Sequence, residues 1–95
     1  MSLFKSELVA INMQYEEVLA IVRPVLIQNF DIPQDQFSLE TPLDVLQENF
    51  QMLSYLMFLE QLLQQQFGEK IQLLEYISTA FHTPEDIIQI VMKQL

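Results

Sequence analysis

Few side chains of this 95-residue chain are of types that carry out chemistry, and their spacing does not assemble a catalytic set. The only histidine, His82, has no cysteine partner in the chain, so we expect it to be structural rather than a ligand or base. The acidic pairs Glu16-Glu17 and Glu85-Asp86 are adjacent, and adjacent helical residues diverge by about 100°, so neither pair can share a proton or a metal ion. No Gly-rich phosphate loop or nucleophile–base–acid set occurs. We therefore expect neither an enzyme nor a metal site.

The charge of the chain restricts its partners. Thirteen acidic residues against four basic ones give a net charge of −9. Such a charge repels phosphate backbones and anionic lipid surfaces, so we expect no nucleic-acid partner and no membrane. It would instead steer the chain towards basic faces of other proteins.

Composition predicts one all-helical domain spanning residues 1–95. The chain is 51% hydrophobic, with one Gly, four Pro and no Cys, which suits a helical core and excludes disulfides. Its beginning lacks the features of a secretory leader. The longest apolar stretch, Met52 to Leu63, contains Ser54, Glu60 and Gln61 and is too short to cross a bilayer. We expect a soluble, cytoplasmic protein.

A first helix is predicted from apolar residues three or four positions apart. They are Phe4, Leu8, Ile11, Tyr15, Leu19, Val22, Leu26 and Phe30. One helix of that length would reach about 40 Å, whereas a domain of this size is about 30 to 35 Å across. We therefore expect a break near Asn12 or a kink at Pro24, which crowds the carbonyl of Ala20. Residues 1–11 would then be an additional helical segment, or in part a remnant of cloning.

The remaining elements follow from helix-start and helix-stop signals. Residues 31–35 should end the first helix and open a long loop held to the core by Phe37 and Leu39. Thr41-Pro42-Leu43-Asp44 and Thr83-Pro84-Glu85-Asp86 both read as a Thr cap followed by a helical Pro. The expected elements are a central helix from Gln47 to Phe67 stopped by Gly68, a third from Lys70 to Ala80 with Ile71, Leu74, Ile77 and Phe81 inward, and a last one burying Ile87, Ile88, Val91 and Leu95.

Four short residue runs occur in an informative order. They are Asn29-Phe30-Asp31-Ile32-Pro33, Thr41-Pro42-Leu43 to Leu46, Leu59-Glu60 with Gln64-Gln65-Gln66-Phe67-Gly68, and Thr83-Pro84-Glu85-Asp86-Ile87. They are similar to the L-G-x-D-P, T-P-L-x-x-L, L-E-x-x-F-G and T-x-x-D-[AI] runs of the acyl carrier protein family and its relatives that carry D-alanine or peptides. The resemblance covers roughly residues 15–91. It implies an acyl-carrier-like four-helix bundle with a long structured loop between helices 1 and 2.

In the family that the chain resembles, a serine in a D-S-L motif opens the second helix and receives the 4′-phosphopantetheine arm of coenzyme A. This chain has no D-S-L. Alignment from the Thr41 run places Asn49 at the serine, and an amide cannot take the arm. Alignment back from Phe67-Gly68 points to about Leu53, one residue from Ser54. We interpret the chain as a carrier fold without its arm, with Asn49 equivalent to the serine and no cofactor. The alternative is an arm on Ser54, where Leu53 replaces the preceding Asp.

The central helix is apolar around its whole axis, which favours either tight packing on several sides or an exposed docking patch. The candidates for partner binding are Phe50, Met52, Tyr55 and Phe58. The family's second helix is acidic, whereas this one carries mostly Gln, so we expect its partners to differ from those of a standard carrier.

Three functions stay open on the sequence. The first is a docking or regulatory member of fatty-acid or polyketide biosynthesis that binds acyl-handling enzymes without carrying an arm. The second is a true carrier modified on Ser54. The third is an unrelated helical interaction protein that forms a homodimer through its central helix.

Overall fold

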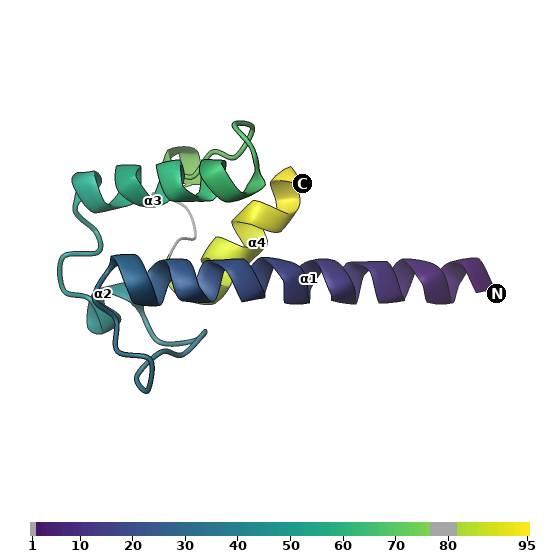
Figure 1. Cartoon of the computed structure of the whole chain (residues 1–95), viewed down its shortest axis with the longest axis horizontal. Coiled ribbons are helices and arrows are strands. Elements are labelled where there is room, and N and C mark those ends of the chain that lie inside the picture. Colours follow the sequence, from purple (N-terminus) through teal and green to yellow (C-terminus); the bar gives the residue numbers. More distant parts are fainter. Residues whose placement is uncertain (1, 77–81) are drawn as a thin grey trace.

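The computed structural model describes the backbone of residues 2–76 and 82–95, and side chains over 14–76 and 82–95. The elements in chain order are α1 (Ser2–Asn29), α2 (Leu43–Leu46), α3 (Leu53–Phe67), the short 3₁₀ helix η1 (Leu74–Tyr76) and α4 (Pro84–Gln94). No strand occurs within these described ranges, so the all-α prediction is confirmed for them. Figure 1 shows α3 and α4 gathered against the C-terminal half of α1.

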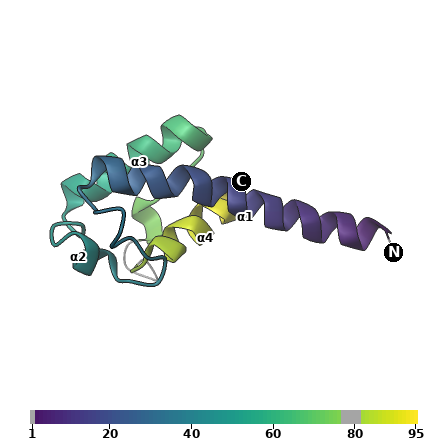
Figure 2. The same cartoon turned by 60° about the horizontal axis from the view of Figure 1, so that its bottom comes forward.

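The prediction of a break near Asn12 is wrong, while the alternative, a kink at Pro24, stays a prediction. Helix α1 is continuous over 28 residues with Pro24 inside it, and residues 2–11 belong to it rather than to a separate segment. A break would be needed only if the helix stayed within the width of the other elements. Instead its N-terminal part extends beyond the other helices, and the molecule measures 48 Å along its longest axis (Figures 1 and 2). Pro24 leaves the carbonyl of Ala20 without its helical donor, but Ala20 is exposed, so water can replace that donor.

The predicted end of α1 and the anchored loop are confirmed. Asp31 adopts a left-handed backbone with φ of 57°, which short polar residues tolerate and which stops the helix. The side chain of Gln47 donates to the carbonyl oxygen of Phe30 over 2.8 Å, which satisfies a helix-end acceptor from the far side of the loop. Phe37 and Leu39 pack half-buried against the core, as expected.

The predicted start of the central helix is wrong. Helix α2 is a single turn whose N-cap is Pro42 rather than Thr41, and Gln47 closes it in an extended conformation. The chain then turns through residues 48–52, and α3 begins only at Leu53. The physical reason is Phe50, whose ring is fully buried 5.1 Å from that of Phe30. The end of α3 at Gly68 is confirmed: Gly68 has φ of 111°, where residues with a side chain are strained.

The expected third helix is wrong over residues 70–73, which are not helical. Only η1 forms in the described part of this stretch, and Ile77 and Phe81 lie outside the described residues. Side chains of α3 hold the segment instead. Glu60 accepts hydrogen bonds from the backbone N–H groups of Leu73 and Leu74 at 2.8 and 3.1 Å. Because Glu60 serves the donors at the start of η1, the backbone there needs no longer helix to be satisfied.

Helix α4 begins as predicted. Thr83 is the N-cap, its hydroxyl accepts from the backbone N–H of Asp86, and the Asp86 carboxylate accepts from the backbone N–H of Thr83, which completes a capping box. The hydroxyl of Tyr15 donates to the carboxylate of Glu85 and thereby ties α1 to the first turn of α4. The expected burial of Ile87, Ile88 and Val91 is confirmed, but Leu95 is 42% exposed, so that prediction is wrong.

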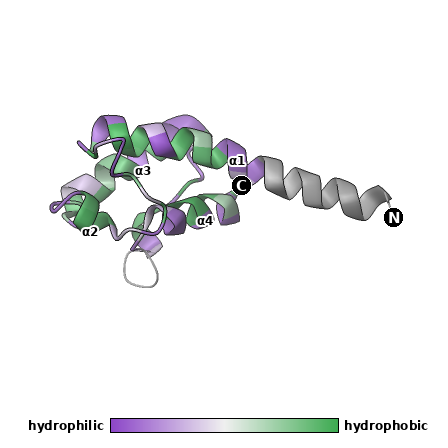
Figure 3. Cartoon of the chain, turned by 90° about the horizontal axis from the view of Figure 1, so that it is seen from below, coloured by the Kyte–Doolittle hydropathy of each residue, from purple (hydrophilic) through white to green (hydrophobic). Residues whose placement is uncertain are grey.

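The core lies between α1, α3 and α4. Hydrophobic residues recur along these helices, interspersed with hydrophilic ones (Figure 3). Of the predicted stripe on α1, Val22, Leu26 and Phe30 are buried while Tyr15 and Leu19 pack partly against the core. The side chains of Phe4, Leu8 and Ile11 lie outside the described residues. Among the described residues, no helix is long and apolar enough to cross a membrane.

Candidate functional site

The positions that the sequence singled out for a carrier arm lie at the start of α3 and in the turn before it. Leu53 is the first residue of α3 and Ser54 the second. Asn49 lies outside the helix, in the preceding turn, where its backbone N–H donates to the side-chain oxygen of Gln47 at 3.3 Å. All three side chains are exposed. Asn49 and Ser54 are thus presented to solvent on different elements.

A group of large hydrophobic side chains is exposed around the same helix start. Met52 is 53% exposed, Leu53 61%, Met57 45% and Phe58 43%. We call these four residues the apolar patch. Met57 and Phe58 share a helix face with Ser54, because they lie three and four positions after it, and Leu53 directly precedes it. The helix that is apolar all round therefore divides into a core face, with Leu56, Leu59 and Leu63, and a solvent face.

The expected exposure of Met52 and Phe58 is confirmed, whereas the expectation that Phe50 is exposed for binding is wrong. Phe50 cannot meet a partner, because its side chain has no exposed surface. Tyr55 is half-buried. Sequence reasoning did not select Leu53 and Met57 as partner-binding residues. Leu53 and Met57 are four positions apart, which indicates that they share one face of the helix. Whether this face is buried or exposed could not be predicted, because the predicted helix starts too early.

The ring of Phe30 organises the aromatic side chains behind the patch. Its centroid lies 5.1 Å from that of Phe50, 5.9 Å from Tyr55 and 5.5 Å from Phe58, all in tilted arrangements. Such geometries are favourable for aromatic pairs. Phe30 and Phe50 are buried whereas Phe58 is not, so the cluster leads from the core to the surface.

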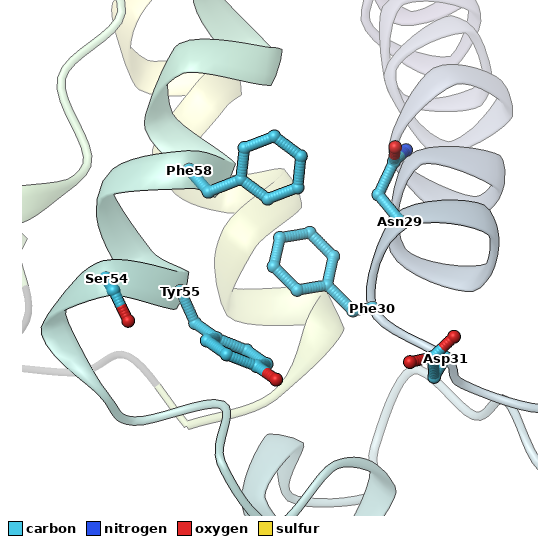
Figure 4. A pocket seen from close by; sticks show the side chains of 6 residues that line it. All are labelled: Asn29, Phe30, Asp31, Ser54, Tyr55 and Phe58. Carbon is cyan, nitrogen blue, oxygen red and sulfur yellow. The ribbon is translucent and has the colours of Figure 1, made fainter.

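A hollow of about 360 Å³ opens beside this cluster, between the end of α1 and the start of α3 (Figure 4). Its lining residues are Asn29, Phe30, Asp31, Ser54, Tyr55 and Phe58. The side-chain nitrogen of Asn29 is occupied by the carbonyl oxygen of Val25, at 3.0 Å. Within the described part of the chain, neither the Asp31 carboxylate nor the Ser54 hydroxyl has a hydrogen-bond or ionic partner. The hollow thus combines aromatic walls with a carboxylate and a hydroxyl available to a ligand.

A second hollow of about 280 Å³ continues along α1 and α3 from Asn29, which lines both. Helix α3 contributes Leu62 and Gln66, and the facing side of α1 contributes Ala20, Ile21, Pro24, Val25 and Gln28. We call the two hollows together the α1–α3 groove. Among the described residues that line it, none is Lys, Arg or His.

The end of the molecule that carries the patch is strongly acidic. The sequence contains no Lys, Arg or His between Arg23 and Lys70. Five exposed acids lie in the segment from the end of α1 to the turn before α3, and Figures 1 and 2 place this segment at the same end as the start of α3. They are Asp31, Asp35, Glu40, Asp44 and Glu48. The field at this end attracts cations.

Two further titratable residues that the sequence offers, His82 and Tyr15, lie at or next to the start of α4. His82 is exposed, and its backbone N–H donates to the Asp86 carboxylate of the capping box at 2.9 Å. The hydrogen bond to Glu85, with a smaller contribution from burial, raises the pKa of Tyr15 to about 12. The described residues contain no group of three or more potential metal ligands among His, Asp and Glu.

No protein-family model, curated protein or solved structure matches this chain. The geometry of the helix start, the apolar patch and the groove therefore provides the basis for assigning a function.

Proposed function

We propose that this chain is a carrier-like module without a phosphopantetheine arm, which acts by binding a partner protein through the apolar patch. The observation that carries the proposal is the start of α3 at Leu53. In the family that the chain resembles, the arm-bearing serine opens the second helix. Counting back from Phe67-Gly68 also leads to Leu53, and a leucine side chain has no hydroxyl that could take the arm.

The structure therefore favours Leu53 over Asn49 as the position equivalent to the serine. Asn49 lies in the turn before α3, four residues too early. Neither side chain can be phosphopantetheinylated, so the proposal holds in both alignments. The partner would be an acyl-handling enzyme of a fatty-acid or polyketide pathway, which meets a hydrophobic side chain where an ordinary carrier presents its arm.

Exposed surface of this kind supports a binding role. Large hydrophobic residues that are exposed together mark interaction sites more often than chance, and Met and Phe are among the residues enriched in the centre of interfaces. The four residues of the apolar patch are each at least 43% exposed on one short stretch of chain. Their contact with a partner would remove this surface from water.

A second candidate, a true carrier with its arm on Ser54, rests on one specific observation. Ser54 is exposed in the first turn of α3 beside the hollow, with no partner for its hydroxyl among the described residues. A transferase could reach such a hydroxyl. Against this candidate, the preceding residue is Leu53 rather than Asp, and Ser54 is the second helical residue rather than the first.

The test is the intact mass of the chain after incubation with coenzyme A and a broad-specificity phosphopantetheinyl transferase. We expect no change for the natural chain. The triple variant Met52→Asp/Leu53→Ser/Ser54→Leu restores D-S-L at the start of α3 and should gain one arm, whereas Asn49→Ser should gain none. An arm on the natural chain that Ser54→Ala abolishes would overturn the proposal in favour of a true carrier. An arm on Asn49→Ser alone would restore the Asn49 alignment.

A further inference from the structure

The α1–α3 groove has the dimensions of a helix-binding site. Four residues of α3 line it at intervals of one turn: Ser54, Phe58, Leu62 and Gln66. Twelve residues separate the first from the last, which corresponds to about 18 Å at 1.5 Å per residue. The facing wall on α1, from Ala20 to Asn29, spans nine positions, or about 14 Å. A site of these dimensions accommodates about two and a half to three turns of another helix.

The chemistry of the groove changes along its length. The large apolar side chains that line it include Phe58, Leu62 and Ile21, none of them fully buried. One end holds the Asp31 carboxylate, which has no partner among the described residues, and this is the acidic end of the molecule. The other end is closed by Gln66 and the exposed Ala20, which are uncharged. A matching ligand is apolar along one side and cationic at one end.

We propose that the α1–α3 groove binds an amphipathic helix of a partner protein, with apolar residues spaced i, i+4 and i+7 along the groove and Lys or Arg at the end next to Asp31. This is helix-in-groove recognition, in which apolar anchors supply affinity and terminal charges set direction. The proposal deepens the proposed function, because it takes protein binding as the activity and names the chemistry of the partner.

Charge complementarity favours this occupant over a second copy of the chain. A second copy carries the same charge of −9, and its residues 24–69 contain seven acids and no cation. Self-association through this end would bring like charges together without compensation, which costs free energy at an interface. A basic helix would neutralise the same acids and gain on-rate from their field.

Three synthetic 18-residue peptides provide the test, measured by calorimetry and by NMR titration of the isotope-labelled full chain. The first has leucines at i, i+4 and i+7 and three lysines at one end, the second replaces the lysines with glutamates, and the third scrambles the leucine positions. We expect the first peptide to bind about tenfold or more tightly than either of the others. Its resonance shifts should centre on Asn29, Phe58 and Leu62.

Three variants locate the binding, two of them a matched pair. Asp31→Asn should weaken the lysine peptide about two- to fivefold, the range of one partly exposed charge pair, while Asp35→Asn, an exposed acid of the same loop that does not line the groove, should have no effect. Ala20→Gln retains charge and helix propensity but fills one end of the groove, so it should also weaken binding without unfolding the chain.

The inference would be overturned if the lysine and glutamate peptides bound equally, if the shifts mapped to another face, or if sedimentation showed a dimer that Phe58→Ala dissociates. Each of these outcomes leaves the mass experiment untouched. An unmodified chain that fails to discriminate the peptides would refute the basic-helix ligand but not the armless carrier.

Discussion

The rings of Phe30 and Phe58 lie 5.5 Å apart, one with 3% of its surface exposed and the other with 43%. This pair connects the interior with the outer face of α3. One side of the Phe58 ring packs against Phe30. The ring is therefore held in place, and its other side stays exposed to solvent. An aromatic side chain that is already ordered loses little conformational entropy when a partner covers it.

Two aromatic neighbours of Phe30, namely Phe50 and Phe58, should therefore respond differently to truncation. Phe50→Ala removes a fully buried ring, and we expect the free energy of unfolding to fall by about 3–5 kcal/mol. Phe58→Ala removes a ring that keeps nearly half of its surface in water, and the loss should be about 1–2 kcal/mol. Urea denaturation of both variants measures the difference. Equal losses would mean that Phe58 is a core residue and not part of a binding surface.

Helix α3 lacks the side-chain cap that Thr83 gives to α4. Met52 is the N-cap residue with φ of −66° and ψ of 139°, an extended geometry that suits a cap, but its side chain accepts no hydrogen bond. We expect Met52→Asp to stabilise the chain by about 1 kcal/mol, because Asp can accept from the first free N–H groups of α3. Thermal unfolding gives the comparison.

The matched change at α4 should have the opposite effect on the free energy of unfolding. Thr83→Ala breaks the capping box of α4 and should cost about 1 kcal/mol. If Met52→Asp left the stability unchanged while Thr83→Ala lowered it, the start of α3 would not be at Leu53. That result would also weaken the alignment of Leu53 with the carrier serine.

The elements that sequence reasoning predicted correctly are those whose signals are local. The capping box at Thr83, the stop at Gly68 and the turn after Phe30 depend on residues within one turn of each other, so they can be read without knowing the fold. The apolar stripe predicted from Phe4 to Phe30 on α1 packs against the core from Tyr15 onwards for the same reason. A helical period needs no tertiary information to define which residues share a face.

The errors arise where a distant contact decides the backbone. The segment between Gln47 and Met52 has no Gly or Pro, so its propensity is helical, but burial of Phe50 beside Phe30 and the bond from Gln47 to the carbonyl of Phe30 turn it instead. Residues 70–73 likewise follow hydrogen bonds to α3 and not their own period. This explains why the sequence placed the candidate site in two alternative registers, at Asn49 and at Leu53 to Ser54.

Stability at high pH should depend on the link between α1 and α4. Because the pKa of Tyr15 in the folded chain is raised from 10.0 to about 12, the protonated tyrosine is favoured by folding. Its contribution is fully present below pH 10 and is lost as the pH rises towards 12. Tyr15→Phe should be slightly less stable at neutral pH and should lose less stability than the natural chain between pH 10 and 12. Denaturation at several pH values, with Tyr55→Phe as the control, tests this.

The solvent face of α3 should tolerate polarity that its core face cannot. Leu53→Gln/Met57→Gln changes two exposed residues of the apolar patch, and we expect the free energy of unfolding to change by less than about 1 kcal/mol, as for most surface substitutions. Binding of a hydrophobic fluorescent dye should fall severalfold, because the exposed apolar surface is removed. Leu56→Gln/Leu59→Gln places the same chemistry on two buried positions and should prevent folding. If the Leu53→Gln/Met57→Gln variant bound the dye as well as the natural chain does, the surface that binds the dye would not lie at the start of α3.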